Sequence, residues 1–475
     1  MKPQDLADPR RRRLLYAGAG LFGLALPACR LLRGAPANGA PFSLGVASGE
    51  PDASGFVIWT RLAPQPLDGG GMPDDDVPVQ WIVADDEQLT RVVRSGTEIA
   101  HAAWAHSVHV EVAGLQPDRW YWYGFRALNA RSTVGRARTL PAAGAPMARL
   151  RVALASCQHY ESGYYGAYRH MAEDDLDLVL HVGDYIYETS HFSGVRSHAA
   201  PEPMSLTQYR NRHALYKLDA DLQRAHARFP WIVTWDDHDV QNDYAGDQSQ
   251  FDDPPALFLL RRAAAYQAYW EHMPLRLAAR PRGPDALMYR RFAIGDLIDL
   301  HVTDERQYRS DQPCGVPGLW GGWLADCPER TDASRTLFGA PQERWLFDGL
   351  ASGRARWNVI AQQLLVAQFD ESAGAGHKWW TDGWDGYPAA RMRLLGHLHE
   401  RGITNTVTLG GDAHCYFASD LKLDFDDPAS PTVASDFTGT SITSDPGGSA
   451  DYFGAMLHKS PHIKFFDSRY RGYAR

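Results

Sequence analysis

The hydrophobic pattern divides the chain into two parts of different texture. Between residues 42 and 140, short segments alternate apolar and polar positions, which is typical of strands with one buried face. After a linker at 142–146, short runs are apolar throughout and alternate with helical segments such as 165–174. Such runs predict an α/β sheet that is covered on both faces. These runs are residues 150–155, 176–182, 231–235, 297–302, 357–362 and 405–409.

The first part predicts a small all-β sandwich over residues 41–142. Leu115, Gln116 and Pro117 form a turn signal that leads into an aromatic segment at 120–125. This arrangement is typical of the tyrosine corner of fibronectin- or Ig-like sandwiches. No chemistry-bearing motif lies here, so we expect a structural role. The expected strands are residues 56–60, 79–83, 106–112 and 120–125.

The first forty residues read as a signal peptide and linker. A basic cluster at 10–13 precedes an apolar run at 14–28, which is shorter than the roughly 18 apolar residues that suggest a membrane span. Residues 11–15 (RRRLL) resemble a twin-arginine export signal, so we expect a periplasmic or extracellular protein. Lipidation of Cys29, after Leu26, Pro27 and Ala28, is a less favoured alternative.

The composition and charge of the chain limit the classes of binding partner that we expect. The chain has 475 residues, with 57 acidic and 48 basic side chains and a formal net charge of −9. A stable nucleic-acid complex usually needs a basic excess, so we expect none. An acidic protein can still bind an anionic ester if bound cations reverse the local field. We expect a small substrate, a monomer and no membrane span.

Five cysteines are present, and two of them suit a disulfide. Cys314 and Cys327 flank a loop rich in Gly, Pro and Trp, and exported proteins tend to pair their cysteines. Cys157 and Cys415 are then left free. Cys157 directly follows the apolar run 150–155, where a thiol could bind a metal.

Polar, metal-competent residues follow four of the apolar runs. The carboxyl ends of parallel strands meet at one edge of a sheet, so we expect these residues to gather there. Carboxylates at this density repel one another unless cations neutralise them. The segments that follow the runs are Ser156-Cys157-Gln158, Gly183-Asp184-Tyr185-Ile186-Tyr187-Glu188, Asp236-Asp237-His238-Asp239 with Asn242 and Asp243, and Gly410-Gly411-Asp412-Ala413-His414.

The ligand types favour two kinds of metal. A Cys157 thiolate, a Tyr187 phenolate and an imidazole from His414 or His238 suit a transition metal, and the phenolate points to ferric iron. Asp and Asn oxygens suit Ca²⁺ or Mg²⁺. Tyr185 or Glu188 could face the site instead of Tyr187. Asp237 is favoured as a ligand over its acidic neighbours, which could hold hydrogen bonds to the ligands.

At these residues the chain resembles the PhoD-like alkaline phosphatase and phosphodiesterase family. The resemblance rests on ASCQ, GDYIYE, WDDHDVQND, DERQYR and GGDAH, and it extends to the N-terminal domain. It implies a calcineurin-like metallophosphoesterase fold over 147–475, a two-sheet sandwich flanked by helices, with Fe³⁺ and two Ca²⁺. Two residues depart from the wider superfamily: Cys157 lies where Asp-x-His is usual, and Asp237 replaces an Asn. The implied metal ligands are Cys157 and Tyr187 for iron, Asp184 shared between metals, and Asp237, Asn242, Asp412 and His414.

The resemblance implies hydrolysis of phosphomonoesters or phosphodiesters by a metal-bound hydroxide, with Asp184 and His238 as catalytic residues. His238 would contact the phosphate or protonate the leaving oxygen. Arg306 either binds phosphate or forms a structural ion pair. A phospholipase-type phosphodiesterase and a non-catalytic metal-binding module remain alternatives, whereas the Gly-x-Ser-x-Gly motif of serine esterases is absent.

The tryptophan-rich segment 377–386 (HKWWTDGWDG) leaves two interpretations open. Trp379, Trp380 and Trp384 could cover a hydrophobic group of the substrate. They could equally pack a long loop.

Overall fold

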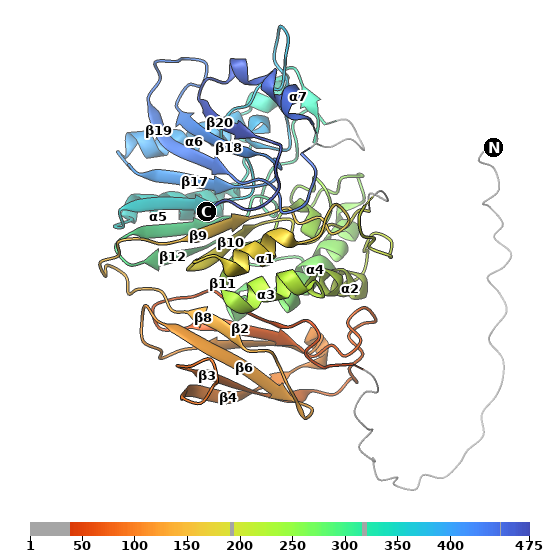
Figure 1. The fold of residues 1–475 in the computed structure, drawn as a ribbon. Helices are drawn as coiled ribbons and strands as arrows, with labels where there is room; N and C mark the ends of the chain where they lie inside the picture. The colour runs from red at the N-terminus through yellow and green to blue at the C-terminus, as the bar shows by residue number, and fades with distance from the viewer. Residues whose placement is uncertain (1–38, 191–193, 316–320, 447) are drawn as a thin grey trace, which may run out of the picture. The chain divides into compact units, whose positions relative to one another are not determined.

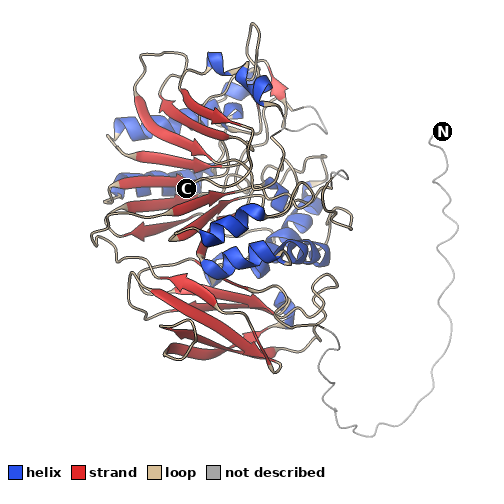
Figure 2. Cartoon of the chain, in the orientation of Figure 1, coloured by secondary structure: helices blue, strands red, loops and turns tan. Residues whose placement is uncertain are grey.

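The computed structural model describes residues 39–190, 194–315, 321–446 and 448–475. The predicted signal peptide and Cys29 lie outside these residues. No helix within the described ranges is long and apolar enough to cross a membrane. Helices and strands alternate through most of the second part, as Figure 2 shows in blue and red.

The first large sheet contains strands from both predicted domains. Its three strands from the α/β part, β9, β10 and β11, run parallel, and β1 continues the sheet by pairing parallel to β11. Across the sheet the order is β5 (Ser107–Val112), β2 (Phe56–Arg61), β1 (Val46–Gly49), β11 (Pro230–Thr234), β10 (Leu178–Val182) and β9 (Val152–Ala155).

The second large sheet belongs to the C-terminal half. β13, β15, β17 and β19 are parallel, whereas the edge strands β12, β18 and β20 pair antiparallel. Its order is β12 (Arg290–Ile294), β13 (Ile298–Val302), β15 (Trp357–Ala361), β17 (Thr406–Gly410), β19 (Thr432–Thr438), β18 (Tyr416–Lys422) and β20 (Ile463–Asp467).

The two sheets face each other across one apolar core, in which Leu154, Leu180 and Ile232 from the first sheet meet Leu300 and Val359 from the second. Strands with two buried faces need a cover on the outside as well, and helices supply it (Figure 1). α1 (Gly166–Glu173), α2 (Leu206–Lys217), α3 (Ala220–Arg228) and α4 (Pro255–His272) share a core with the outer face of the first sheet, and α5 (Gly339–Ser352) and α6 (Pro388–Glu400) share one with the second. The predicted two-sheet sandwich flanked by helices is confirmed.

The N-terminal sandwich packs a small sheet against the β5–β2–β1 side of the first sheet, with Phe56, Val79 and Tyr123 in its core. The predicted corner is present, because the Tyr121 hydroxyl accepts a hydrogen bond from the Gln116 amide at 3.0 Å. The small sheet contains β4 (Val92–Ala100), β3 (Val77–Ala84), β6 (Trp120–Ala127) and β7 (Ala130–Arg131), with β8 (Gly135–Arg138) paired to β6. Because β1 pairs with β11, the sandwich and the α/β part share one continuous sheet, which the sequence pattern did not predict.

Three further short elements are a strand pair and a helix. β14 (Trp323–Leu324) pairs antiparallel with β16 (Trp379–Trp380), and α7 (Ala450–Gly454) lies near the C-terminal strands. The predicted disulfide between Cys314 and Cys327 is present next to β14. Cys157 and Cys415 are free and buried.

Candidate metal centre

Residues that follow strands of both large sheets converge on one site. Within it, Cys157, Asp184 and His414 each offer a ligand atom, and these atoms all lie within 4.8 Å of one another. The segments come from the ends of β9, β10 and β17, which lie in different sheets. The sequence pattern predicted the edge of a single sheet, but the site forms where the strand ends of two packed sheets meet.

A second group of ligand atoms adjoins the first and shares Asp184 with it. Asp184, Asp236, Asp237 and Asp412 also place one carboxylate oxygen each within 4.8 Å of one another. Asp236 and Asp237 follow β11 and open a short 3-10 helix over Asp237–Asp239. The two groups therefore differ in chemistry: one includes a thiol and an imidazole, and the other contains only carboxylates.

Tyr187 reaches the first group through its hydroxyl. The Tyr187 oxygen lies 3.2 Å from His414 Nε2 and 2.8 Å from the Ser444 hydroxyl oxygen. The Ser444 hydroxyl donates a hydrogen bond to the Cys157 carbonyl at 2.8 Å, so Ser444 links two of the predicted iron ligands. No sequence motif marked Ser444.

Several site residues have a left-handed backbone. Cys157, Asp184, Asp412 and His414 have φ between 54° and 57°, a region that side chains other than Gly rarely adopt. Such conformations persist where the surrounding structure enforces them, and they cluster at functional sites. Gly183, at φ 117°, lies so close to β11 that an added Cβ would meet the Asp236 Cβ at 2.4 Å.

Burial shifts the pKa values of three acidic groups at the site. Burial raises the pKa of Asp184 well above its usual value and raises that of Asp412 to about 7. Burial also raises the pKa of the Cys157 thiol, with the charges of Asp184 and Asp412 adding to the effect. A cation would reverse these shifts, because it stabilises the anionic forms of all three groups.

One oxygen of Asp184 is suited to such a cation. Among the described residues, no group donates a hydrogen bond to Asp184 Oδ2, although the atom is buried. The other oxygen accepts from the His238 amide at 3.3 Å. A buried oxygen without a partner is costly unless an ion or a proton binds it.

His238 is fixed by its neighbours. Its Nδ1 lies 2.7 Å from Glu188 Oε2, and its ring stacks on Tyr187 with 4.1 Å between ring centroids. Burial alone would lower the pKa of His238, but Glu188 and Asp184 raise it well above its usual value. Because the Glu188 carboxylate lies at Nδ1, Nε2 is the ring nitrogen of His238 that is left for the pocket.

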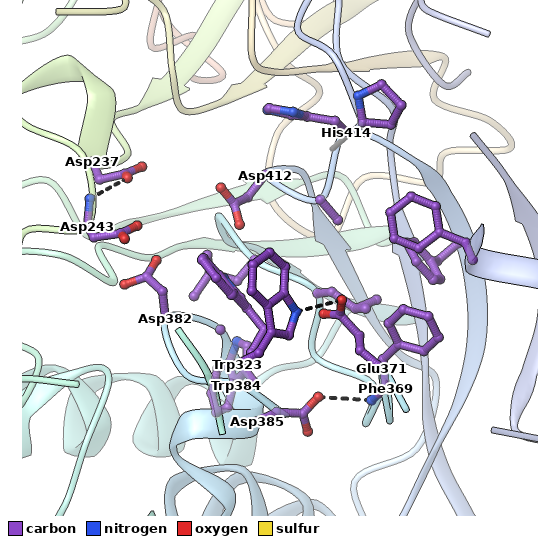
Figure 3. Close-up of a pocket in the computed structure, with 18 of the residues that line it drawn as sticks. Asp237, Asp243, Trp323, Phe369, Glu371, Asp382, Trp384, Asp385, Asp412 and His414 are labelled. Carbon is purple, nitrogen blue, oxygen red and sulfur yellow. Dashed lines mark hydrogen bonds between the residues drawn. The ribbon is translucent and has the colours of Figure 1, made fainter. Parts of the chain in front are cut away.

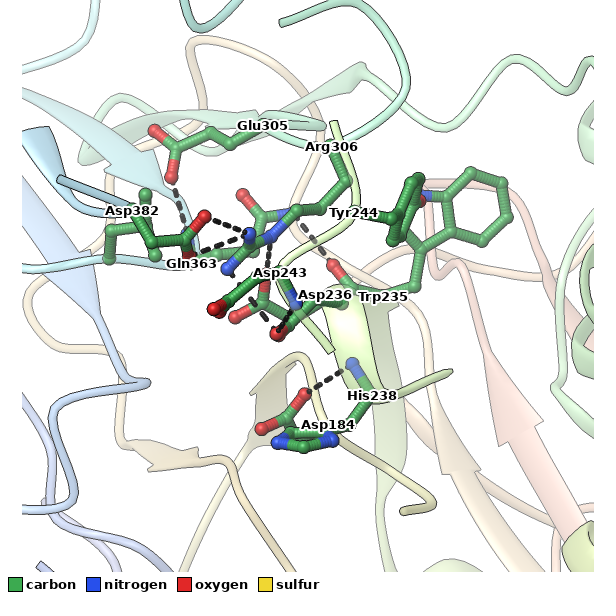
Figure 4. A network of polar contacts seen from close by, with 12 residues as sticks. Asp184, Trp235, Asp236, His238, Asp243, Tyr244, Glu305, Arg306, Gln363 and Asp382 are labelled. Atoms are coloured by element: carbon green, nitrogen blue, oxygen red, sulfur yellow. Dashed lines mark hydrogen bonds and ion pairs between the residues drawn. The ribbon is translucent and has the colours of Figure 1, made fainter. Parts of the chain in front are cut away.

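Arg306 lies between the carboxylates of Asp236 and Asp382 and is fully buried (Figure 4). It forms ion pairs with Asp236 through Nε, with Asp382 at 2.7 Å and with Asp237 at 3.4 Å. This geometry agrees with the ion-pair alternative, because three carboxylates already engage the guanidinium. Asp382, which also pairs with Arg309 at 3.3 Å, had no signal in the sequence beyond its place in the tryptophan-rich loop.

A cavity of about 380 Å³ opens onto the site (Figure 3). Asp237, His238, Asn242, Asp412 and His414 line one part of it, and the remaining lining combines several aromatic side chains with acidic and aliphatic ones. The predicted site residues are thus brought together: each lines this cavity, belongs to a ligand group or contacts a member of one. Sequence reasoning did not select Asp243 or Asp382, which form a third carboxylate group with Asp237.

The fold and the site together define a class of protein, the metal-dependent hydrolases in which loops of two stacked sheets hold the ligands. The family model of PhoD-like phosphatase matches residues 152–475, and the model of its N-terminal domain matches residues 28–141. The chain belongs to the PhoD-like phosphatase family and is a phosphoesterase.

Two comparisons show how close the match is. The chain is 48% identical over 444 residues to alkaline phosphatase D of Bacillus subtilis (strain 168), and the aligned region covers 92% of this chain and 75% of that protein. A solved structure of PhoD matches with a TM-score of 0.88 and 48% identity, covering 92% of this chain and 84% of that chain. The resemblance that the motifs suggested is therefore confirmed.

Proposed function

We propose that this protein is an exported phosphoesterase that holds one Fe³⁺ and two Ca²⁺ and hydrolyses phosphomonoesters, phosphodiesters or both. The observation that carries the proposal is the pair of adjoining ligand groups that share Asp184. One group offers soft and phenolic ligands and the other offers oxygens, so together they suit two kinds of metal.

The first group fits ferric iron. Cys157 and Tyr187 would bind it as thiolate and phenolate, and Asp184 would bridge to the second group. The unpartnered Asp184 Oδ2 supports this assignment, because an ion would satisfy it. The short distance from the Tyr187 hydroxyl to His414 Nε2 brings both side chains to the same position.

The second group fits calcium. Asp237 and Asp412 supply carboxylates, and Asn242 lines the same cavity with an amide oxygen of the kind that Ca²⁺ accepts. His414, the last residue of the GGDAH motif, would instead bind through its imidazole in the first group. Asp236 and Asp382 are held by Arg306, so we assign them to positioning the ligands.

The bound ions would supply Lewis-acid chemistry, polarising the phosphate and lowering the pKa of a water in the pocket. The protein contributes a proton donor and an orienting frame. His238, held at Nδ1 by Glu188, can donate from Nε2 to a phosphate oxygen or to the leaving oxygen. Arg306 keeps Asp236 and Asp237 in place without reaching the substrate.

Metal analysis combined with an ester assay tests the proposal. Purified protein should contain iron and calcium, and it should release nitrophenol from p-nitrophenyl phosphate or from its bis-ester. A chelator should abolish this release, and calcium should restore it. The ratio of the two rates would assign the monoester or diester preference.

A matched variant controls for loss of metal or activity that any Asp→Asn change would cause. Asp412→Asn should lose metal and activity together, whereas the exposed carboxylate variant Asp285→Asn should keep both. Protein without iron but with full activity would contradict the iron assignment. Chelator-insensitive hydrolysis would contradict metal dependence altogether.

We also propose the domain limits and the export route that the sequence predicts. Residues 1–40 would be the signal and linker, 41–142 the sandwich and 147–475 the catalytic domain. The family-model boundaries at residues 141 and 152 support the division. Replacement of Arg11 and Arg12 by Lys should block export by a twin-arginine route, which fractionation of the producing cells would detect.

A further inference from the structure

The cavity at the metal centre has an apolar half that the chemistry of phosphate does not require. In Figure 3, Asp237, Asp243 and Asp382 lie on one side of the pocket, and Phe369 and Glu371 lie on another. The aromatic side chains that line the cavity are Trp323, Trp380, Trp384, Phe369, Phe417, Tyr452 and Phe453. A phosphate group needs polar partners, so this wall serves another part of the substrate.

The three tryptophans of the loop separate into two roles. Trp384 is 1% exposed, packs edge-on against Phe338 and hydrogen-bonds Gln362, and Trp379 is 5% exposed and packs under Arg330. Both are therefore buried packing residues of the loop, and Trp384 borders the cavity only from this buried position. Trp380 lines the cavity and is only partly buried.

Trp323 extends the cavity wall from a different segment. It pairs with Trp380 across β14 and β16, and the two rings lie 4.6 Å apart. Its indole Nε1 donates a hydrogen bond to Glu371 Oε2 at 2.7 Å. The side chain is nevertheless 51% exposed, so it is held in place without being covered.

Tyr452 and Phe453 of α7 also line the cavity. The Phe453 ring lies 6.4 Å from that of Phe369 and 5.5 Å from that of Phe466, which fixes its orientation. Tyr452 is 41% exposed. Fixed, partly exposed aromatic rings around a concave surface are typical of a site for an apolar ligand group.

We propose that this aromatic wall, made of Trp323, Trp380, Tyr452 and Phe453, binds the alcohol group of the ester and selects alcohols that are apolar or aromatic. The wall is continuous with the metal centre, so a phosphate held there would direct its ester group onto the rings. An apolar cavity of about 150 Å³ accommodates benzene. The cavity of about 380 Å³ therefore has room for a phosphate and one ring.

This inference rests on the proposed phosphoesterase function, and phosphonates test it separately. The C–P bond is not an ester bond, so phenylphosphonate and methylphosphonate act as inhibitors that differ only in the group beyond phosphorus. Inhibition constants are measured on the full, metal-loaded protein against hydrolysis of p-nitrophenyl phosphate. We expect phenylphosphonate to bind about 10-fold or more tightly than methylphosphonate.

Variants of the wall locate the effect. Trp323→Ala and Phe453→Ala should each raise the inhibition constant of phenylphosphonate about 5-fold to 10-fold. The inhibition constant of methylphosphonate should stay within about twofold of the wild-type value. Trp323→Phe should recover most of the lost affinity, because a ring remains. Phe465→Ala removes an exposed ring of β20 outside the cavity and should change neither constant.

The outcomes separate the two proposals. Equal binding of the two phosphonates, with p-nitrophenyl phosphate still hydrolysed, would contradict the proposed role of the aromatic wall but not the phosphoesterase function. Tighter binding of 2-aminoethylphosphonate than of phenylphosphonate would also contradict that role, because Glu371 would then select a cation. Absence of both phosphonate binding and ester hydrolysis would overturn the proposed function itself.

Discussion

At the scale of single residues, the site depends on side chains that hold the ligands as much as on the ligands. Glu188 and Tyr187 fix His238 from two directions, one by a hydrogen bond and one by stacking. Ser444 links Tyr187 to the backbone of Cys157. Such contacts orient a ligand or proton donor within fractions of an ångström, which its chemistry requires.

Replacement of His238 distinguishes proton donor from ligand. His238→Asn should lower turnover of p-nitrophenyl phosphate by about 10²-fold to 10⁴-fold, because the proton donor is lost. Iron and calcium per chain should stay unchanged, as elemental analysis would measure. A parallel fall in metal content and turnover would instead make His238 a plain ligand.

The buried carboxylate Asp382 should matter for stability. Asp382→Asn leaves Arg306 and Arg309 with less compensation in a fully buried position, and such a break costs about 3–5 kcal/mol. The midpoint of denaturant unfolding would measure the loss. Asp285→Asn, which removes a largely exposed partner of Arg262, should cost less than about 1 kcal/mol. Equal effects of the two variants would contradict the role of the buried network.

At the scale of elements, the strand ends combine parallel strands with tight left-handed turns. Parallel strands of both sheets deliver their last residues to one site, where Cys157, Asp184 and Asp412 combine a left-handed backbone with a candidate ligand side chain. The close approach of Gly183 to Asp236 joins the turn after β10 to the turn after β11. These turns therefore act as one assembly.

An alanine at Gly183 tests that assembly. Its Cβ would collide with Asp236, and φ of 117° would strain the backbone, so Gly183→Ala should reduce metal content and activity more than about 10-fold. Gly144→Ala is the matched control, because φ is also positive at 76° but no atom lies within 4 Å of the added Cβ. That variant should cost about 1 kcal/mol of stability and keep full activity. Full metal content and activity in Gly183→Ala would contradict the assembly.

At the scale of the whole molecule, the sandwich and the α/β part share structure. β1 continues the catalytic sheet, and Trp59 of the sandwich packs in one core with Ala214 of α2. Lys217, the last residue of α2, is buried there with its Nζ 4.5 Å from the centroid of the Trp59 ring. A buried amine at this junction makes stability depend on pH.

Burial lowers the pKa of Lys217 from 10.5 to about 7. Between these values the unfolded chain binds a proton that the folded chain does not, so this group makes folding more favourable as pH rises. From pH 7 to pH 9.5, the free energy of unfolding of the wild type should therefore rise relative to that of Lys217→Met, by on the order of 2–3 kcal/mol. Denaturant midpoints at the two pH values measure it, and the exposed Lys464→Met is the control. A difference that does not change with pH would contradict a neutral buried amine.

The sequence by itself determined the local elements and the composition of the site. The apolar runs became strands because their pattern reflects burial on two faces, and the residues after β9, β10 and β11 met because parallel strands of one sheet share an edge. The residues after β17, in the second sheet, joined them through the packing of the two sheets. The disulfide followed from two cysteines that flank one loop. These features depend on neighbours in the sequence or on a general rule of sheets.

Only the tertiary structure decided the contacts between distant segments. The pairing of β1 with β11, the ion pair of Arg306 with Asp382 and the meeting of Trp323 with Trp380 each join parts of the chain without any local periodicity to mark them. The same holds for which tryptophans pack the loop and which face the cavity. Such choices depend on how loops fill the space that the sheets leave, and residue type alone does not encode that space.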